Sequence, residues 1–406
     1  MPGPLEGIRI IECGGYLSAP SACYILGDLG AEVIKIEDRV KGDPVRGMES
    51  TFGRGMIMPD GTNILFETAN RNKKSITLNL KSEKGKEILY RLIEISDVFC
   101  TNYSLPAIEE LNLCYENLRQ YNIKLVYGLA TGYGSLGPDS RKRAFDAIAQ
   151  ARSGIMTTIG EPDDPPSQIA GALFDQVTGT ILAGGIMAAL IARDKKGIGQ
   201  KVEVSLLGSG IHMQAYNVNV TLLRGRPMPR SSKKTLRNPL ANHYECADGK
   251  WLLLCEAQSD RFWSAFCSAI NAPELENDAR FSRAKARREN AFELTSILEK
   301  IFKTRTRAEW LQILETRGMG MAFSAINELT ELTGDDQIMA NDYIIDVEHP
   351  TLGKIKMTGF PFKFSETPTG VWRTAPQFGQ HTEEVLMDLL GFTWEDLEKL
   401  KEAEVI

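Results

Sequence analysis

The sequence predicts an α/β protein of two domains, the larger built on a parallel β-sheet and the smaller of α+β type. Segments with strand character alternate with helical segments over the first 131 residues, and a Pro-, Ser- and base-rich stretch begins at residue 224. Alternation of strands and helices is typical of parallel sheets covered by helices. At 406 residues the chain exceeds what one hydrophobic core normally supports, so more than one domain is expected.

The chain opens with a strand, a helix and a second strand. The strands are predicted at 8–12 and 33–37, and the helix at 18–29. This βαβ unit is typical of nucleotide-binding, Rossmann-like folds. The first turn, Glu12–Leu17, does not supply the G-x-G-x-x-G pattern, although Glu37 stands where such folds place the acid that binds a ribose. A dinucleotide-dependent oxidoreductase therefore remains an alternative.

Further strands are predicted at 75–80, 97–100 and 125–131, with an amphipathic helix at 83–95. Together with the opening unit they give a sheet of about six strands. Loops at the strand ends of a parallel sheet bind ligands, and three basic loops on one edge would suit a ligand with several phosphates. Any one of these loops alone is better explained as solvated surface charge. The basic loops are Lys41–Arg46, Asn70–Lys74, and Gly132–Pro138 followed by Arg141–Arg143.

Asp175 is a lone carboxylate at the point where a loop enters an apolar helix. It follows the Gly- and Pro-containing run 160–168 and precedes the small-residue helix predicted at 180–192. The backbone N–H groups and the dipole at such a position stabilise an anion, either as a helix cap or as a nucleophile. Position alone favours the cap, because Asp is a preferred N-cap residue.

The second part of the chain has a different character. The stretch 224–237 is predicted to be a linker or mobile loop. A hairpin follows at 244–255, and Thr306 and Glu309 have the spacing of a capping box. We therefore expect a large discontinuous domain of residues 1–223 and 330–406 and a small domain of 224–329. The other expected elements are helices at 260–270, 290–303, 382–390 and 394–403, and strands within 349–359.

Composition and missing motifs exclude several classes. The formal charge of −6 argues against nucleic acid as the main partner. The seven cysteines include no C-x-x-C pair, no signal peptide is evident, and no uninterrupted apolar run is long enough to span a membrane, so a cytoplasmic protein is expected. The four histidines lack metal-site spacing, and neither a G-x-S-x-G elbow nor a P-loop is present. We expect no metal.

A set of motifs along nearly the whole chain resembles the class III CoA-transferases of the CaiB/BaiF type. This family includes formyl-CoA, carnitine and bile-acid CoA-transferases. The similar runs are Pro4–Glu12, Ala19–Pro20, Leu29–Glu37, Gly42–Asp43, Arg46–Gly47, Asn70–Leu80, Thr131–Pro138, Phe145–Gln150, Ser153–Gly154, Gly197–Ser205 and Ala375–Leu386.

The resemblance implies a function for Asp175, which falls on the family's catalytic nucleophile. CoA would move from an acyl-CoA thioester to a carboxylic acid through a mixed anhydride and an aspartyl-CoA thioester. The family forms interlocked homodimers, and the same is expected here. The implied CoA-binding residues are Arg39, Arg46, Asn72, Lys73, Lys74, Gly132, Tyr133, Gly134 and Arg143, and the implied substrate pocket is Tyr16, Leu17, Ser18, Phe145 and Phe174.

Departures from the family pattern narrow the expected substrate. Formyl-CoA transferases have Gln at Leu17 and Arg at Asp38, so exchange of formate or oxalate is disfavoured, and Arg39 would replace the missing Arg. A bulkier, less polar pocket favours an aryl, branched or 2-hydroxy acid as acceptor. Related racemases carry a histidine where this chain has Phe145, which disfavours the alternative of an acyl-CoA racemase. Ser104 stands where relatives often carry Lys or Arg.

Overall fold

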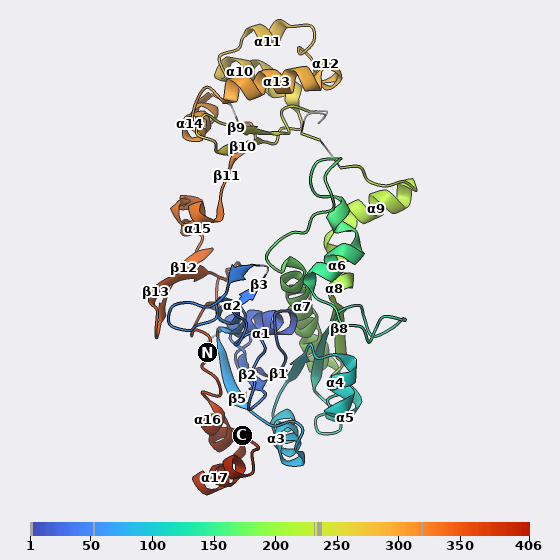
Figure 1. The fold of residues 1–406 in the computed structure, drawn as a ribbon, viewed down its shortest axis with the longest axis vertical. Coiled ribbons are helices and arrows are strands. Elements are labelled where there is room, and N and C mark those ends of the chain that lie inside the picture. The colour runs from blue at the N-terminus through green and yellow to red at the C-terminus, as the bar shows by residue number, and fades with distance from the viewer. Residues whose placement is uncertain (1–2, 52, 231, 234–237, 318–319) are drawn as a thin grey trace. The chain divides into compact units, whose positions relative to one another are not determined.

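The computed structural model describes residues 3–51, 53–230, 232–233, 238–317 and 320–406, and these form two compact units (Figure 1). The large unit contains the chain up to Met156, Gln168–Arg226 and Met339–Ile406, and the small unit contains Thr157–Ser167 and Pro227–Ile338. The segment 157–167 thus groups with the small unit, although it lies outside the range 224–329 that was predicted for the small domain. Of the predicted linker 224–237, residues 231 and 234–237 lie outside the described residues.

The large unit is built on one parallel sheet of six strands in the order β5-β2-β1-β6-β7-β8. The chain runs outward from β1 to β2 and β5 on one side, then returns to β6 and continues to β7 and β8 on the other. Adjacent β1 and β6 are therefore the topological switch point of the sheet. The strands are β1 (Arg9–Cys13), β2 (Glu32–Glu37), β5 (Lys73–Thr77), β6 (Val98–Thr101), β7 (Val126–Thr131) and β8 (Lys201–Ser205).

Both faces of this sheet are buried. Ile10 in β1 points into a layer with α1 (Ser18–Asp28) and α7 (Leu173–Lys196). Its neighbour Ile11 points into the opposite layer, with α3 (Glu83–Glu94), α16 (Thr382–Leu390) and α17 (Trp394–Glu402). The alternation follows from the two-residue period of a strand, and it explains why these strands read as continuous apolar runs.

Helices α1 and α7 pack closely (Figure 1). A Cβ atom on Gly179 of α7 would lie 2.5 Å from the Cβ of Ser21 and 2.9 Å from the carbonyl oxygen of Ser18, so only glycine fits there. By length and hydropathy α7 could cross a membrane, which the sequence analysis did not anticipate. It is instead a core helix, because Leu182, Ile186 and Leu190 are buried against the sheet layer.

Strand β5 forms one edge of the sheet, and a segment near the C-terminus covers it. The backbone N–H of Asn72 donates to the carbonyl of Arg373 at 3.0 Å, and that of His381 donates to the carbonyl of Ser75 at 2.8 Å. In return His381 Nδ1 accepts from the Ser75 N–H at 3.2 Å, and Thr382 Oγ1 accepts from the Thr77 N–H at 3.0 Å. The backbone groups on this part of β5 are thereby satisfied.

Shorter elements complete the large unit. Of the strands predicted within 349–359, β13 is found there, and it pairs antiparallel with β12, which begins before the predicted range at Ile344. The further elements are β3 (Ser50–Thr51), β4 (Arg54–Gly55), α2 (Ile64–Asn70), α4 (Leu105–Glu110), α5 (Tyr115–Leu118), α6 (Asp146–Ser153), η1 (Ile155–Thr157), α8 (Leu206–Met213), α9 (Ala215–Arg224), β12 (Ile344–His349) and β13 (Gly353–Thr358).

The small unit packs helices against a three-stranded antiparallel sheet in the order β11-β10-β9. The predicted hairpin is confirmed, and Gly249 in its turn has a φ of +74°. The predicted capping box is also present, since the Thr306 N–H donates to Glu309 at 2.8 Å. The elements are β9 (His243–Glu245), β10 (Trp251–Leu254), α10 (Ser259–Ala269), α11 (Glu274–Asn277), α12 (Ala284–Glu289), α13 (Ala291–Phe302), α14 (Arg307–Arg317), β11 (Phe323–Ile326) and η2 (Leu329–Gly334), with α15 (Asp336–Ala340) at the boundary.

Candidate active site

Asp175 lies in the first turn of α7 and does not cap the helix. The N-cap position is Ala172, in a left-handed conformation with φ 52° and ψ 44°. A carboxylate from another element takes the capping role, because Asp146 Oδ2 accepts hydrogen bonds from the backbone N–H groups of Phe174 at 2.6 Å and Asp175 at 3.2 Å. The interpretation of Asp175 as an N-cap is therefore wrong, and its carboxylate is available for another role.

The Asp175 side chain is half-buried. Among the described residues, no side-chain or backbone group is recorded as donating a hydrogen bond to its carboxylate. Burial, and to a lesser degree the negative charge of Asp146, together raise the pKa of Asp175 to about 7. A carboxylate that is poorly solvated and more basic than usual is a better nucleophile than a paired one. Carboxylates with a purely structural role are normally hydrogen-bonded.

Two aromatic side chains are associated with Asp146, the residue that caps α7. Phe145 immediately precedes the capping Asp146, and its ring meets that of Tyr16 edge-on, with centroids 5.9 Å apart and an interplanar angle of 78°. Tyr16 is 38% exposed and Phe145 49%, so both rings offer surface to a ligand. Leu17 and Phe174 are buried, and the Ser18 hydroxyl accepts from Asn102 Nδ2 at 3.0 Å. Of the five residues of the predicted substrate pocket, Tyr16 and Phe145 are therefore the exposed ones.

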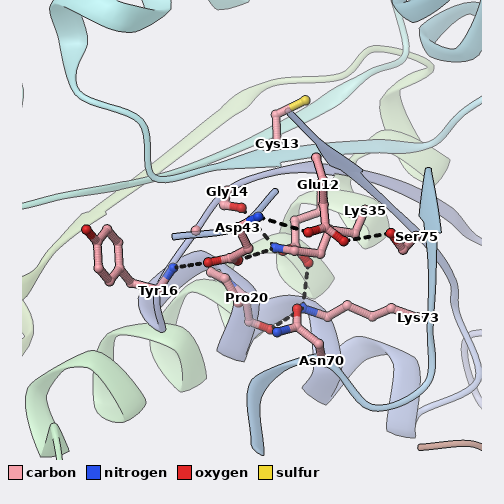
Figure 2. A network of polar contacts seen from close by, with 12 residues as sticks. Glu12, Cys13, Gly14, Tyr16, Pro20, Lys35, Asp43, Asn70, Lys73 and Ser75 are labelled. Atoms are coloured by element: carbon pink, nitrogen blue, oxygen red, sulfur yellow. Dashed lines mark hydrogen bonds and ion pairs between the residues drawn. The ribbon is translucent and has the colours of Figure 1, made fainter. Parts of the chain in front are cut away.

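A buried polar network holds the loop that carries Tyr16 (Figure 2). Lys35 Nζ contacts Glu12 at 2.7 Å, Asp43 at 2.8 Å and the carbonyl of Gly14 at 2.9 Å. Asp43 Oδ1 in turn accepts from the backbone N–H of Tyr16 at 3.3 Å. This contact stabilises Tyr16 in a left-handed conformation, with φ +59°, that a non-glycine residue rarely adopts.

Asn102, at the end of β6, fixes the same loop from the other side of the switch point. Its Oδ1 accepts from the Gly15 N–H at 3.1 Å, and its Nδ2 donates to the Gly15 carbonyl at 2.7 Å. Sequence reasoning missed Asn102, Asp146 and Lys35 as contributors. The signal for Lys35 was a cation inside an otherwise apolar strand, which is rare unless the charge is paired.

The predicted basic loops do not share one edge of the sheet. Lys73 and Lys74 are the first residues of β5 and pair in register with Val33 and Ile34, so they lie at the amino end of the strand. The Lys73 ammonium is buried, with Glu12 at 2.6 Å, Asn70 at 2.9 Å and the Pro20 carbonyl at 3.0 Å. A phosphate contact there would require this network to rearrange.

Three further predicted CoA-binding residues are also engaged with protein groups. Lys74 contacts Glu32 at 3.0 Å and Glu384 at 2.9 Å. The side chain of Asn72 is bonded to Asp28 at 2.7 Å, and Arg46 pairs with Glu37 at 2.7 Å.

The carboxyl ends of β2 and β7 carry the remaining predicted residues. Arg39 follows β2 and contacts Glu404 at 2.9 Å. Gly132, Tyr133 and Gly134 follow β7, and a Cβ on Gly132 would lie 2.3 Å from that of Ala144. Arg143 is exposed and makes no recorded side-chain contact with the described residues. It stands two residues before Phe145 in the chain.

Glu37 has no capacity left to bind a ribose. It is 2% exposed, and its carboxylate accepts from Arg46, from the Asp43 N–H at 2.9 Å and from the Ser75 hydroxyl at 2.6 Å. This arrangement argues against the dinucleotide-dependent alternative. Among the described residues there is also no group of three or more His, Cys, Asp or Glu side chains placed to hold a metal ion.

Comparisons with known proteins agree with this geometry. Over 403 residues the chain is 32% identical to the (R)-2-hydroxy-4-methylpentanoate CoA-transferase of Clostridioides difficile, covering 99% of both chains. It is 32% identical over 405 residues to the cinnamoyl-CoA:phenyllactate CoA-transferase of Clostridium sporogenes, covering 99% of this chain and 97% of that one. A solved structure of a CaiB/BaiF family protein from Brucella suis superimposes with a TM-score of 0.86 at 28% identity, over 96% of this chain and 100% of that one.

The model of CoA-transferase family III matches residues 5–382, nearly the whole chain. The parallel sheet and Asp175 at the entrance of α7 lie in the matched region. So do the motifs that carried the resemblance, except for Pro4 at their start and residues 383–386 at their end. The chain is a member of CoA-transferase family III.

Proposed function

We propose that this enzyme moves CoA between carboxylic acids through a covalent intermediate on Asp175. The Asp175 carboxylate attacks the thioester carbon of the donor, the C–S bond breaks, and a mixed anhydride forms as CoA thiolate leaves. The thiolate then attacks the Asp175 carbonyl carbon, which releases the donor acid and leaves an aspartyl-CoA thioester. The acceptor carboxylate repeats both steps in reverse order and regenerates Asp175. The sequence consumes no net proton and needs no external energy source.

The observation that carries this proposal is the unpaired state of the Asp175 carboxylate. The backbone N–H groups of the first turn of α7 are already used by Asp146, so Asp175 is not required as a cap. Its side chain is half-buried without a recorded partner, at the positive end of a 24-residue helix. Such a group suits attack on a thioester carbon better than structural support.

For CoA we propose a binding surface along the carboxyl ends of β1, β2 and β7. Arg143 carries the clearest support, because its guanidinium is exposed and makes no recorded contact with the described residues. The Gly132–Gly134 turn and Arg39 lie at the same edge, and the partner of Arg39, Glu404, is itself an exposed side chain. Arg46, Asn72, Lys73 and Lys74 have protein partners in this structure, so we assign them to the support of the fold around the site.

For the acceptor we propose a bulky aryl, branched or 2-hydroxy acid. The exposed rings of Tyr16 and Phe145 offer an apolar, edge-on surface next to the residue that caps α7. The names of two relatives, which transfer CoA to 2-hydroxy-4-methylpentanoate and phenyllactate, support this choice. A panel of acids offered with several acyl-CoA donors, read by mass spectrometry, tests it.

We further propose a cytoplasmic, interlocked homodimer. All seven cysteines are free thiols, as expected of a reducing compartment. Helix α9 has no buried residue, and Tyr216, Leu222 and Leu223 on it are between 73% and 87% exposed. Apolar side chains of this kind on one helix mark a protein interface. Light scattering of the purified protein measures the oligomeric state.

Trapping the intermediate tests the chemistry directly. Wild-type protein mixed with a donor acyl-CoA alone should gain a mass adduct of CoA on the peptide that contains Asp175. Borohydride should reduce that thioester, and hydroxylamine should convert it to a hydroxamate. Folded Asp175→Asn should show neither adduct nor transfer, since an amide cannot form the anhydride. Transfer that survives in this variant, with an adduct on another peptide, would exclude the mechanism.

A further inference from the structure

A cavity of about 730 Å³ lies in the large unit. Its walls are the segment 373–381 that covers β5, the loop and helix start at 60–67, and two residues of the β12–β13 turn. Neither Asp175 nor Tyr16, Phe145 or Arg143 is among the residues that line it.

The acidic groups of this cavity are already hydrogen-bonded to the protein. Asp60 accepts from the hydroxyl of Thr62 at 2.7 Å and that of Thr351 at 2.6 Å. Glu67 accepts from the Ala375 N–H at 3.3 Å and faces His349 Nε2 at 3.5 Å. These carboxylates therefore have little capacity left for a cationic ligand.

Two donors of the cavity, by contrast, have no recorded acceptor among the described residues. The Arg373 side chain is exposed and makes no recorded hydrogen bond or ion pair with the described residues. His381 is only 8% exposed, and its Nδ1 accepts from the Ser75 N–H, so its proton is on Nε2. Burial lowers the pKa of His381, in keeping with a neutral imidazole that donates from Nε2. No hydrogen bond from Nε2 to a described residue is recorded.

The Arg373 guanidinium is presented from a fixed backbone. Asn72 Oδ1 accepts from the Arg373 N–H at 3.0 Å, and the Arg373 carbonyl accepts from the Asn72 N–H at 3.0 Å. Arg46 and Lys73 also line the cavity, but their charges are paired with Glu37 and Glu12. Arg373 is thus the cation that remains for a ligand.

We propose that this cavity binds a small oxyanion, a carboxylate or phosphate, between the Arg373 guanidinium and the Nε2–H of the buried His381. The guanidinium fork matches two oxygens of either group, and a buried imidazole N–H supplies a third, directed donor. The amide groups of Gln377 and Gln380 line the same wall and offer further donors. The site is separate from the aspartate that carries CoA, and it suits an organic acid or inorganic phosphate.

Calorimetric titration of the full chain with succinate and with inorganic phosphate tests the proposal. We expect saturable binding of at least one anion to the wild type, and at least about tenfold weaker binding to Arg373→Met. Arg373→Lys, which keeps the charge and loses the fork, should bind with intermediate affinity. Arg119→Met is the matched control, because Arg119 is also exposed without a recorded partner and does not line the cavity.

Three results would overturn the proposal. One is the absence of saturable binding of either anion, and another is equal affinity in Arg373→Met and wild type. The third is a rise in the KM for acyl-CoA in Arg373→Met that parallels the loss of anion affinity, because the cavity would then be part of the CoA site. An unchanged KM together with lost anion binding supports a separate site. Circular dichroism of the variants checks that they are folded.

Discussion

Replacing Asp175 by Asn should make the protein more stable while abolishing transfer. The pKa of Asp175 is about 7 in the fold against an ordinary value of 3.8. Ionising this carboxylate therefore costs roughly 2–4 kcal/mol more in the folded chain than in the unfolded one, the lower figure allowing for water at a half-buried group. Asn has nearly the same shape and carries no charge, so it removes that cost. If Asp175 were a helix cap, its replacement by Asn would change the free energy of unfolding by less than about 1 kcal/mol.

The gain in stability should depend on pH in a defined direction. Because the pKa is raised, the folded wild type binds more protons than the unfolded chain between pH 3.8 and about 7. The wild type therefore loses stability from this group as pH rises through that window. The difference between Asp175→Asn and the wild type should be smallest near pH 4 and should level off above pH 7 to 8.

Urea unfolding of both proteins at several pH values from 4.5 to 8.5 measures this difference. Asp163→Asn is the matched control, since it makes the same substitution at an exposed aspartate. A stability gain of the same size at every pH, or a loss of stability above pH 7, would refute the reasoning. The same raised pKa predicts that transfer by the wild type declines as pH falls below about 7, because the nucleophile becomes protonated.

Three further changes test other parts of the structure. Gly179→Ala should destabilise the protein by roughly 1–3 kcal/mol in the same unfolding assay, because the added Cβ overpacks the contact with α1. Gly184→Ala on the same helix, where a Cβ meets open space, should be neutral or stabilising by up to about 1 kcal/mol. Arg143→Gln should raise the KM for acyl-CoA roughly threefold to tenfold with little change in kcat, and added salt should reduce the difference; Arg119→Gln should leave KM unchanged. Since Phe145 cannot act as an acid or base, a chiral 2-methylacyl-CoA incubated in deuterated water should gain no label at the α-carbon, and rapid uptake would point to a racemase.

Periodicity and local signals predicted most elements of the fold. The predicted helix 382–390 coincides with α16, and the hairpin and the Thr306 capping box follow from rules that act within a few residues. Helix α7 is longer than its prediction and begins at Leu173, because its start depends on Asp146, which is 28 residues away from Phe174 in the chain. Caps that come from distant segments leave no local pattern.

The assignment of ligand contacts was the weaker part of the sequence analysis. A run such as Asn70–Lys74 reads as a solvated or phosphate-binding loop, yet Lys73 is a fully buried strand residue paired with Glu12. Which cations remain free depends on tertiary contacts, which only the fold supplies. The same holds for Arg143 and Arg373, whose lack of recorded partners could not be read from composition.

The covering of β5 by residues near the C-terminus has a consequence for synthesis of the chain on the ribosome. All six strands of the sheet have been made once Ser205 emerges, but the segment from Arg373 to Thr382 follows only about 170 residues later. At translation rates of 5–20 residues per second the open strand edge would wait roughly 10–30 s. Exposed edges pair with other chains, so this interval is the period of greatest risk of aggregation for the nascent protein. A chain truncated before residue 372 would remain in that state permanently.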